Sequence, residues 1–67
     1  MMQISINGEA REFTAPLSLL DLIDLLELKG KRIAIEQNGE IVPKSQHATS
    51  LLSEGDVLEM VVAVGGG

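Results

Sequence analysis

The stretch Met2-Gln3-Ile4-Ser5-Ile6-Asn7-Gly8 lies at the start of the chain and decides how the fold begins. Apolar Met2, Ile4 and Ile6 alternate with polar residues, which is the period of a half-buried β-strand. Asn-Gly is the preferred pair for a two-residue hairpin turn, because both central positions of a type I′ turn need positive φ. The stretch therefore predicts a β-hairpin, with residues 9–14 as its return strand.

Residues 17–22 mark the start of a helix after this hairpin. Ser18 and Asp21 stand three positions apart as a capping box, in which each side chain accepts a hydrogen bond from the backbone N–H of the other residue. Gly30 is expected to end the helix. Between them, apolar residues recur at helical spacing and predict one face packed on a sheet: Leu19, Leu22, Ile23 and Leu26.

A second hairpin and a final strand follow the helix. Residues 32–42 form two strands around Asn38-Gly39, and Pro43 closes the second strand, as expected at a sheet edge. Residues 57–64 form the last strand. It is apolar on both faces apart from Glu59, which is typical of a central strand covered on one side and contacted on the other. We expect it in the middle of the sheet, beside the first strand, since neither strand suits a solvated edge.

The order of hairpin, helix, hairpin and strand predicts an α+β fold, with a mixed sheet of about five strands and one main helix packed on one face. This is the β-grasp, or ubiquitin-like, arrangement. The predicted organisation is a β-grasp domain over residues 1–64 and a flexible C-terminal glycine tail over residues 65–67. The expected core is apolar: Ile4, Ile6, Phe13, Leu19, Leu22, Ile23, Leu26, Ile33, Ile35, Leu52, Leu58, Met60 and Val62.

Composition excludes several classes of function. The 67 residues include no Cys and one His, so neither a disulfide framework nor a Cys/His zinc site is available, and no metal site is expected. The net charge of -5 opposes binding to nucleic acid and to anionic membranes. No apolar run approaches the roughly 20 residues of a membrane span. Because no Cys indicates an oxidising compartment, we expect a cytoplasmic protein.

No internal catalytic site is expected. His47 lies in the polar stretch of residues 44–50 with no second His, and is interpreted as a solvated loop residue. The basic cluster Lys29, Lys31 and Arg32 is interpreted as a solvated turn at the end of the helix. The chain is therefore predicted not to be an enzyme.

The tail Gly65-Gly66-Gly67 is the remaining feature that could take part in a chemical reaction. Glycine lacks Cβ, so such a segment is thin enough to thread a narrow channel in another protein. Adenylation by ATP would give the carboxylate of Gly67 a good leaving group, and a sulfur nucleophile would then form a C-terminal thiocarboxylate. A frayed terminus is the alternative interpretation of the same residues.

A tether of this kind needs a docking surface elsewhere on the domain to supply most of the affinity. We expect that surface on the sheet face away from the helix, where Val61 and Ala63 are flanked by Glu59 and Ala34. Apolar residues on an open face favour a partner contact. The residual surface hydrophobicity of a small protein would also account for them.

Five stretches together resemble the ThiS family of thiamine-biosynthesis sulfur carriers, over nearly the whole chain. They are residues 4–9, the leucine-rich helix, residues 33–43, residues 54–56 and residues 64–67. The resemblance implies that a ThiF-like E1 adenylyltransferase uses ATP to adenylate Gly67. It also implies that a sulfur donor such as a cysteine desulfurase system forms the thiocarboxylate, and that a ThiG-like thiazole synthase takes the sulfur for the thiamine thiazole. The chain would be a protein co-substrate without a bound cofactor.

Other functions stay open on the residues alone. The small subunit of molybdopterin synthase resembles this chain, but it is usually longer and carries prolines before the final glycines, where this chain has residues 61–64. A ubiquitin-like modifier would use the same activated glycine to form isopeptide bonds. A toxin-antitoxin or adaptor module would bind through its sheet and would not need Gly67.

Overall fold

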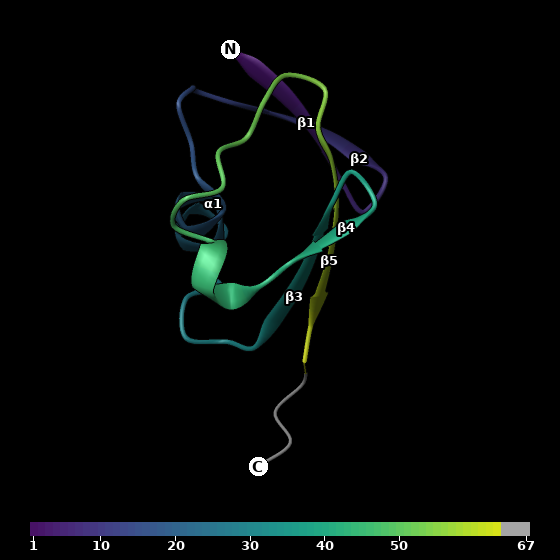
Figure 1. The fold of residues 1–67 in the computed structure, drawn as a ribbon. Helices are drawn as coiled ribbons and strands as arrows, with labels where there is room; N and C mark the ends of the chain where they lie inside the picture. The colour runs from purple at the N-terminus through teal and green to yellow at the C-terminus, as the bar shows by residue number, and fades with distance from the viewer. Residues whose placement is uncertain (64–67) are drawn as a thin grey trace.

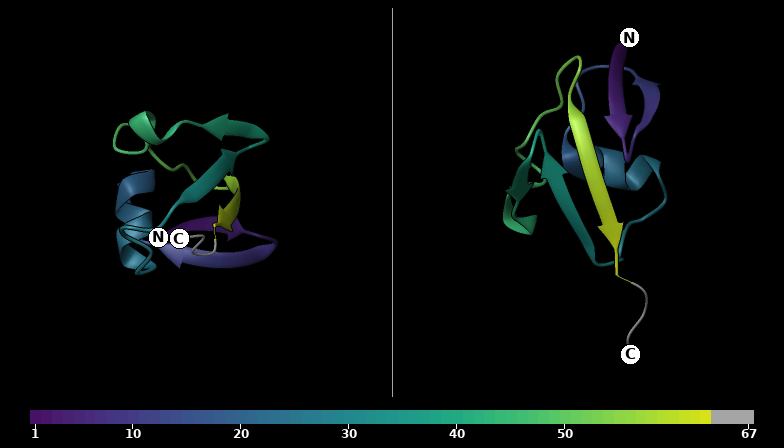
Figure 2. Two further views of the ribbon diagram at one scale, coloured as in Figure 1. Left: turned by 90° about the horizontal axis from the view of Figure 1, so that it is seen from below. Right: turned by 90° about the vertical axis from the view of Figure 1, so that its right-hand side faces the viewer.

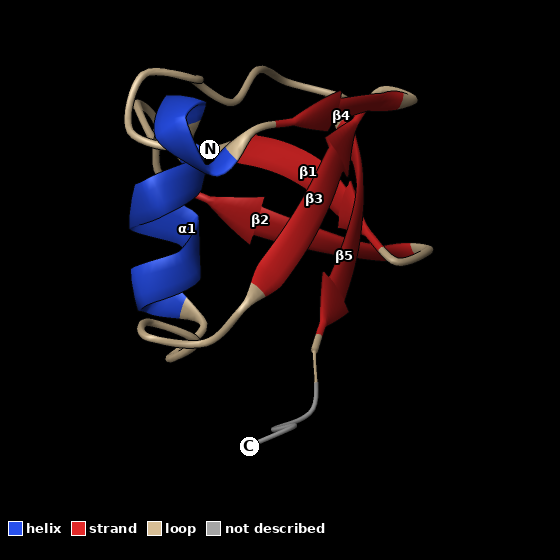
Figure 3. Ribbon diagram, turned by 60° about the horizontal axis from the view of Figure 1, so that its bottom comes forward, coloured by secondary structure: helices blue, strands red, loops and turns tan. Residues whose placement is uncertain are grey.

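The computed structural model describes residues 1–63, and it folds them into a five-stranded mixed sheet with one α-helix against one face (Figures 1 and 3). Residues 64–67 lie outside the described part of the chain. The α+β, β-grasp prediction is confirmed. The elements are β1 (Met2–Ile6), β2 (Glu9–Phe13), α1 (Leu19–Leu25), β3 (Ile33–Gln37), β4 (Glu40–Val42), the 3₁₀ helix η1 (Lys44–Gln46) and β5 (Val57–Val62).

The strand order β2-β1-β5-β3-β4 places β5 at the centre of the sheet, between β1 and β3 (Figure 2). β5 runs parallel to β1, where Ser5 lies opposite Val57, and antiparallel to β3 over five residue pairs. The predicted position of the last strand beside the first is therefore confirmed. None of the helices in residues 1–63 has the length and apolar character that crossing a membrane requires.

Both Asn-Gly turns have the predicted conformation and also fasten β5. Asn7 and Asn38 have φ values of 51° and 53°, as a type I′ turn requires. The Asn7 side chain donates to the carbonyl of Met60 at 3.1 Å and accepts from the N–H of Met60 at 2.8 Å. The Asn38 side chain accepts from the N–H of Val57 at 2.9 Å. The two hairpin tips thereby hold the central strand from both sides.

Asp56 anchors the start of β5 with a buried carboxylate. Asn38 donates to its Oδ1 at 3.0 Å, while Gln37 and the Ser53 N–H donate to Oδ2 at 2.9 and 2.8 Å. Burial raises the pKa of Asp56, but the hydrogen bonds from Asn38, Ser53 and Gln37 favour the ionised form more strongly. The pKa is therefore lowered overall.

The capping box at the helix start is confirmed, because Ser18 and Asp21 exchange both hydrogen bonds at 3.1 Å. The predicted end at Gly30 is wrong. α1 ends at Leu25, where the N–H of Leu28 donates to Ile23 and the N–H of Glu27 donates to Asp24. These two bonds make a Schellman motif with Glu27 at a φ of 60°, the left-handed position that glycine usually occupies.

The core lies between α1 and the facing side of the sheet, and its apolar character is as predicted. Met2 and Leu17 belong to it although they were not expected there, and Val62 is only half-buried and outside it. Phe13, Leu26 and Ile33 are partly buried against its edge. The residues at its centre are fully buried: Ile4, Leu19, Leu22, Ile35 and Leu58.

His47 is not a solvated loop residue, and that prediction is wrong. Its side chain is 4% exposed, and its Nε2 lies 3.2 Å from the carbonyl oxygen of Val42. Its own carbonyl accepts from the N–H of Leu20 at 2.9 Å, one of the free donors in the first turn of α1. His47 thus joins the segment after β4 to the start of the helix.

Candidate functional site

β5 carries the chain from the centre of the sheet toward the glycine tail. Beyond the strand, the N–H of Ala63 donates to the carbonyl of Arg32 at 2.9 Å, so the last described residue is still tied to the chain before β3. Figure 1 shows β5 pointing out of the domain at this end. The predicted site residues Gly65, Gly66 and Gly67 lie outside the described residues. The structure describes the chain up to Ala63, which is held by its hydrogen bond to Arg32.

The four predicted docking residues lie together on the sheet face away from α1. Val61 is 66% exposed and stands directly opposite Ala34 on β3. Glu59 and Ala63 are exposed at alternate positions on either side of Val61. Leu58 and Met60 point to the core instead, because successive side chains of a strand face opposite sides of the sheet.

Two further apolar side chains extend this open face. Ile41 is 74% exposed beside Glu36, and Val57 is 48% exposed at the start of β5. Sequence reasoning missed both, although a signal existed for each. Val57 shares the strand parity of Val61, and the two-residue turn at Asn38-Gly39 sets the register that places Ile41 opposite the outward-facing Glu36.

Two carboxylates meet at the middle of the open face. Glu59 on β5 stands directly opposite Glu36 on β3, and both side chains are exposed. Like charges in directly opposed positions destabilise a sheet. A cationic side chain of a partner placed between them would relieve that repulsion. The open face therefore combines apolar contact area with an acidic centre.

The described residues contain no group of three or more His, Asp or Glu side chains arranged to hold a metal ion. Asp56, whose pKa is lowered, has its carboxylate occupied by three structural hydrogen bonds. His47 has its Nε2 directed at a backbone carbonyl. Within residues 1–63, the exposed residues around Val61 lie beside Ala63, the last described residue before the tail.

Comparison with known proteins finds relatives along nearly the whole chain. The family model described as "ThiS family" matches residues 4–67. A thiazole synthase of Paramagnetospirillum magneticum is 42% identical over 66 residues, which are 98% of this chain and 20% of that protein. The chain thus spans about a fifth of that relative's length. The sulfur carrier protein ThiS of Escherichia coli is 29% identical, and the match covers 98% of this chain and all of that protein.

The fold agrees with these relatives. A crystal structure of a thiamine biosynthesis protein (ThiS) from Geobacter metallireducens superimposes with a TM-score of 0.83 at 23% identity, covering 98% of this chain and 100% of the other. At 23% identity the structural similarity shows a shared fold only, whereas the family model shows family membership. Because that model matches 64 of the 67 positions, from residue 4 to residue 67, the chain belongs to the ThiS family.

Proposed function

We propose that this chain is the sulfur carrier of thiamine thiazole biosynthesis. An E1-like adenylyltransferase joins the carboxylate of Gly67 to AMP and releases pyrophosphate. A persulfide that a cysteine desulfurase system forms on a donor protein then attacks the acyl adenylate and displaces AMP, which gives an acyl disulfide. A second thiol cleaves that S–S bond, is oxidised to a disulfide with the donor's thiol, and leaves a thiocarboxylate on Gly67 that passes its sulfur to thiazole synthase. The chain is the co-substrate in each step, and ATP is bound by the activating enzyme.

The observation that carries the proposal is the position of β5. It is held between β1 and β3, pinned by the side chains of Asn7 and Asn38, and tied at Ala63 to Arg32. A glycine tail that starts from so firmly held a strand reaches a partner's active site from a defined point. The strand itself is already ordered, so only the ordering of the tail has to be offset on binding.

The open face supports a docking role close to that point. Val61, Ala63, Glu59 and Ala34 form one exposed patch, and Val57 and Ile41 lie on the same face beyond the Glu59–Glu36 pair. Adjoining apolar residues bordered by polar ones, as Val61, Ala63 and Ala34 are, are typical of a protein contact surface. We propose that the activating enzyme and thiazole synthase each bind this patch while the tail enters their active sites.

The identity of the acceptor rests on the relatives. The proteins from Paramagnetospirillum magneticum and Magnetococcus marinus that this chain matches are named thiazole synthase, and in each the matched part is 20% of the protein. A carrier-like domain inside a longer thiazole synthase favours thiazole synthase as the partner of the separate chain.

Intact-mass measurement tests the chemistry directly. The chain is incubated with ATP, the activating enzyme and a sulfur donor, and we expect a mass gain equal to the difference between a sulfur and an oxygen atom. A chain lacking Gly67 is the matched control and should keep its mass. No gain in the full chain, with an activating enzyme that modifies its own known carrier, would overturn the proposal.

Two rival functions give other results with the same material. Transfer of the sulfur to a molybdopterin synthase large subunit, and not to thiazole synthase, would assign the chain to molybdenum cofactor synthesis. Covalent attachment to lysine side chains, seen as conjugates that resist thiol reagents, would identify a ubiquitin-like modifier.

A further inference from the structure

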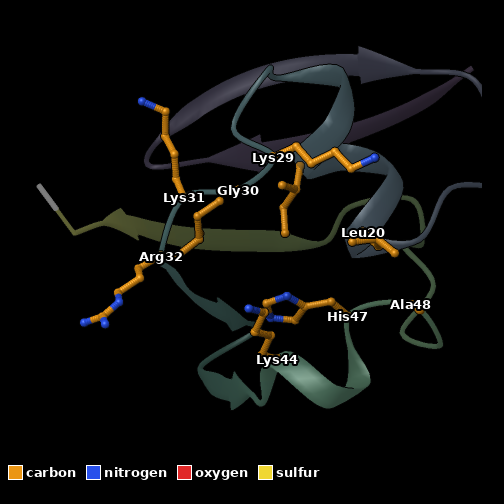
Figure 4. A pocket seen from close by; sticks show the side chains of 10 residues that line it. Leu20, Lys29, Gly30, Lys31, Arg32, Lys44, His47 and Ala48 are labelled. Carbon is orange, nitrogen blue, oxygen red and sulfur yellow. The ribbon is translucent and has the colours of Figure 1, made fainter. Parts of the chain in front are cut away.

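A hollow of about 600 Å³ lies on the domain between the loop that follows α1 and the segment around η1 (Figure 4). Its volume falls within the range of about 300–1,000 Å³ that is usual for ligand pockets. It is separate from the open face of the sheet, since none of the docking residues proposed above lines it. The family comparison and the proposed sulfur chemistry leave it without a role.

The rim of this hollow collects most of the positive charge of the chain. Four of the five Lys and Arg residues line it, Lys29, Lys31 and Arg32 on one side and Lys44 on the other. The fifth, Arg11, lies on β2 and pairs with Glu9 at 3.1 Å. Within residues 1–63 no carboxylate forms an ion pair with any of the four. In a chain of net charge -5, such a concentration makes the hollow a local attractor for anions.

Apolar side chains line the hollow together with the buried side chain of His47. Leu20 is 46% exposed, Ile33 is half-buried, and Ile23 belongs to the core. An apolar side chain seated against this lining would bury area on both sides, which favours association. The hollow therefore suits a ligand with both apolar and anionic groups.

The cationic ends point in different directions. Figure 4 shows the terminal nitrogen atoms of Lys29, Lys31 and Arg32 extending away from one another and outward from the middle of the lining residues. A single small anion is bound best where several donors converge on it. Cationic groups that point apart suit a peptide ligand that carries several carboxylates spaced around one apolar residue.

We propose that this hollow docks an acidic segment of a partner protein, with an apolar side chain against the apolar lining and carboxylates beside the rim. A nucleic acid or an anionic membrane fits less well, because an extended polyanion would also face the acidic remainder of the domain. A short acidic segment contacts the cationic rim alone.

The hollow also lies close to the start of the tail. Arg32, on its rim, accepts the backbone hydrogen bond of Ala63. An acidic segment bound here would hold the domain at a second point and so orient the tail that follows Ala63. The inference goes beyond the proposed function and rests on it only in taking the partner to be an enzyme that handles this tail.

Amide chemical shifts test the proposal without any sulfur chemistry. The ¹⁵N-labelled full chain is titrated at low salt with the peptide acetyl-Glu-Glu-Leu-Glu-Glu-amide. We expect saturable shifts at Leu20, Lys31, Ile33 and Ala48, and none at Val61. Exchange of the peptide's leucine for glycine, or Lys31→Glu in the chain, should weaken binding about fivefold, as loss of one close contact or reversal of one charge near the surface does.

Arg11→Glu is the matched control, since it makes the same change of charge far from the hollow and should leave the titration unaltered. Absence of saturable shifts around the hollow would overturn the proposal. So would equal binding of inorganic pyrophosphate or tighter binding of single-stranded RNA, which would point to a small anion or a nucleic acid. The intact-mass assay tests Gly67 separately, so failure of one proposal is distinguishable from failure of the other.

Discussion

The two faces of β5 carry similar apolar residues but have different surroundings. Leu58 is fully buried and Met60 is 8% exposed beneath α1, whereas Val57 and Val61 on the opposite face are 48% and 66% exposed. One helix covers only one face of a sheet, so the second face stays open to other molecules. The difference shows that apolar residues of one strand divide between the buried core and an exposed face according to which side of the sheet α1 covers.

The largest expected effect is a difference in the free energy of unfolding between substitutions on the two faces of β5. Leu58→Ala removes a fully buried side chain and should lower the free energy of unfolding by about 2–5 kcal/mol. Val61→Ala on the open face should change it by less than about 0.5 kcal/mol. Urea unfolding of both variants measures the contrast. Equal losses would mean that the open face contributes to the fold as the inner face does.

The next effect concerns how β5 is held along its edge. Asn7→Ala deprives the N–H and C=O groups of Met60 of their side-chain partners, worth about 2 kcal/mol at about 1 kcal/mol for each bond, and adds the strain of alanine at positive φ. Asn7→Gly loses the same bonds but keeps the positive φ without strain, so it isolates the hydrogen-bonding part of the loss. Hydrogen exchange at the Met60 amide should speed up in both variants. Unchanged exchange would show that the Asn7 side chain does not fasten the strand.

A charge on the open face should change binding without changing stability. Val61→Asp introduces a carboxylate among exposed apolar residues and should weaken binding to the activating enzyme about tenfold, which corresponds to about 1.4 kcal/mol. Ala10→Asp, on the same side of the sheet but on the outer strand β2, is the matched control and should bind as the unaltered chain does. Calorimetric titration gives the affinities. Equal affinity of all three chains would remove the open face from the docking interface.

The smallest effect is a dependence of stability on pH. The pKa of Asp56 is lower in the folded chain than its ordinary value of 3.8, so the ionised carboxylate stabilises the fold. That contribution is complete above the unfolded pKa and is lost as the pH falls from about 3.8 through the lower folded value. Urea unfolding of the native chain and of Asp56→Asn across this range should show a shallower acid slope in the variant. Parallel slopes would assign the acid sensitivity to other carboxylates.

Much of the fold could be predicted because its signals are local. The Asn-Gly turns depend on positive φ at adjacent residues, and the capping box of Ser18 and Asp21 lies within one helical turn. The end of α1 could not be predicted in the same way. Glu27 takes the left-handed position there, and the half-buried Leu28 that follows it packs against the core, which is a tertiary contact.

Part of the candidate site could likewise be predicted from local sequence, and part could not. Parity along β5 was enough to predict that Val61 and Ala63 share a face with Glu59, and the structure places them so. His47 was misassigned because its polar neighbours in sequence are exposed while its ring reaches the carbonyl of Val42. The cationic hollow was missed for a related reason, since Lys44 is far from Lys29 and Lys31 along the chain.

The sequence by itself determined the order of elements, the register of both hairpins and the family, because these follow from residue type at fixed short spacings. The tertiary structure alone decided that the side chain of His47 is buried and which distant cations surround one hollow. Those outcomes depend on how the chain after β4 packs against α1, with His47 bonded to the helix start, and no local pattern encodes that contact.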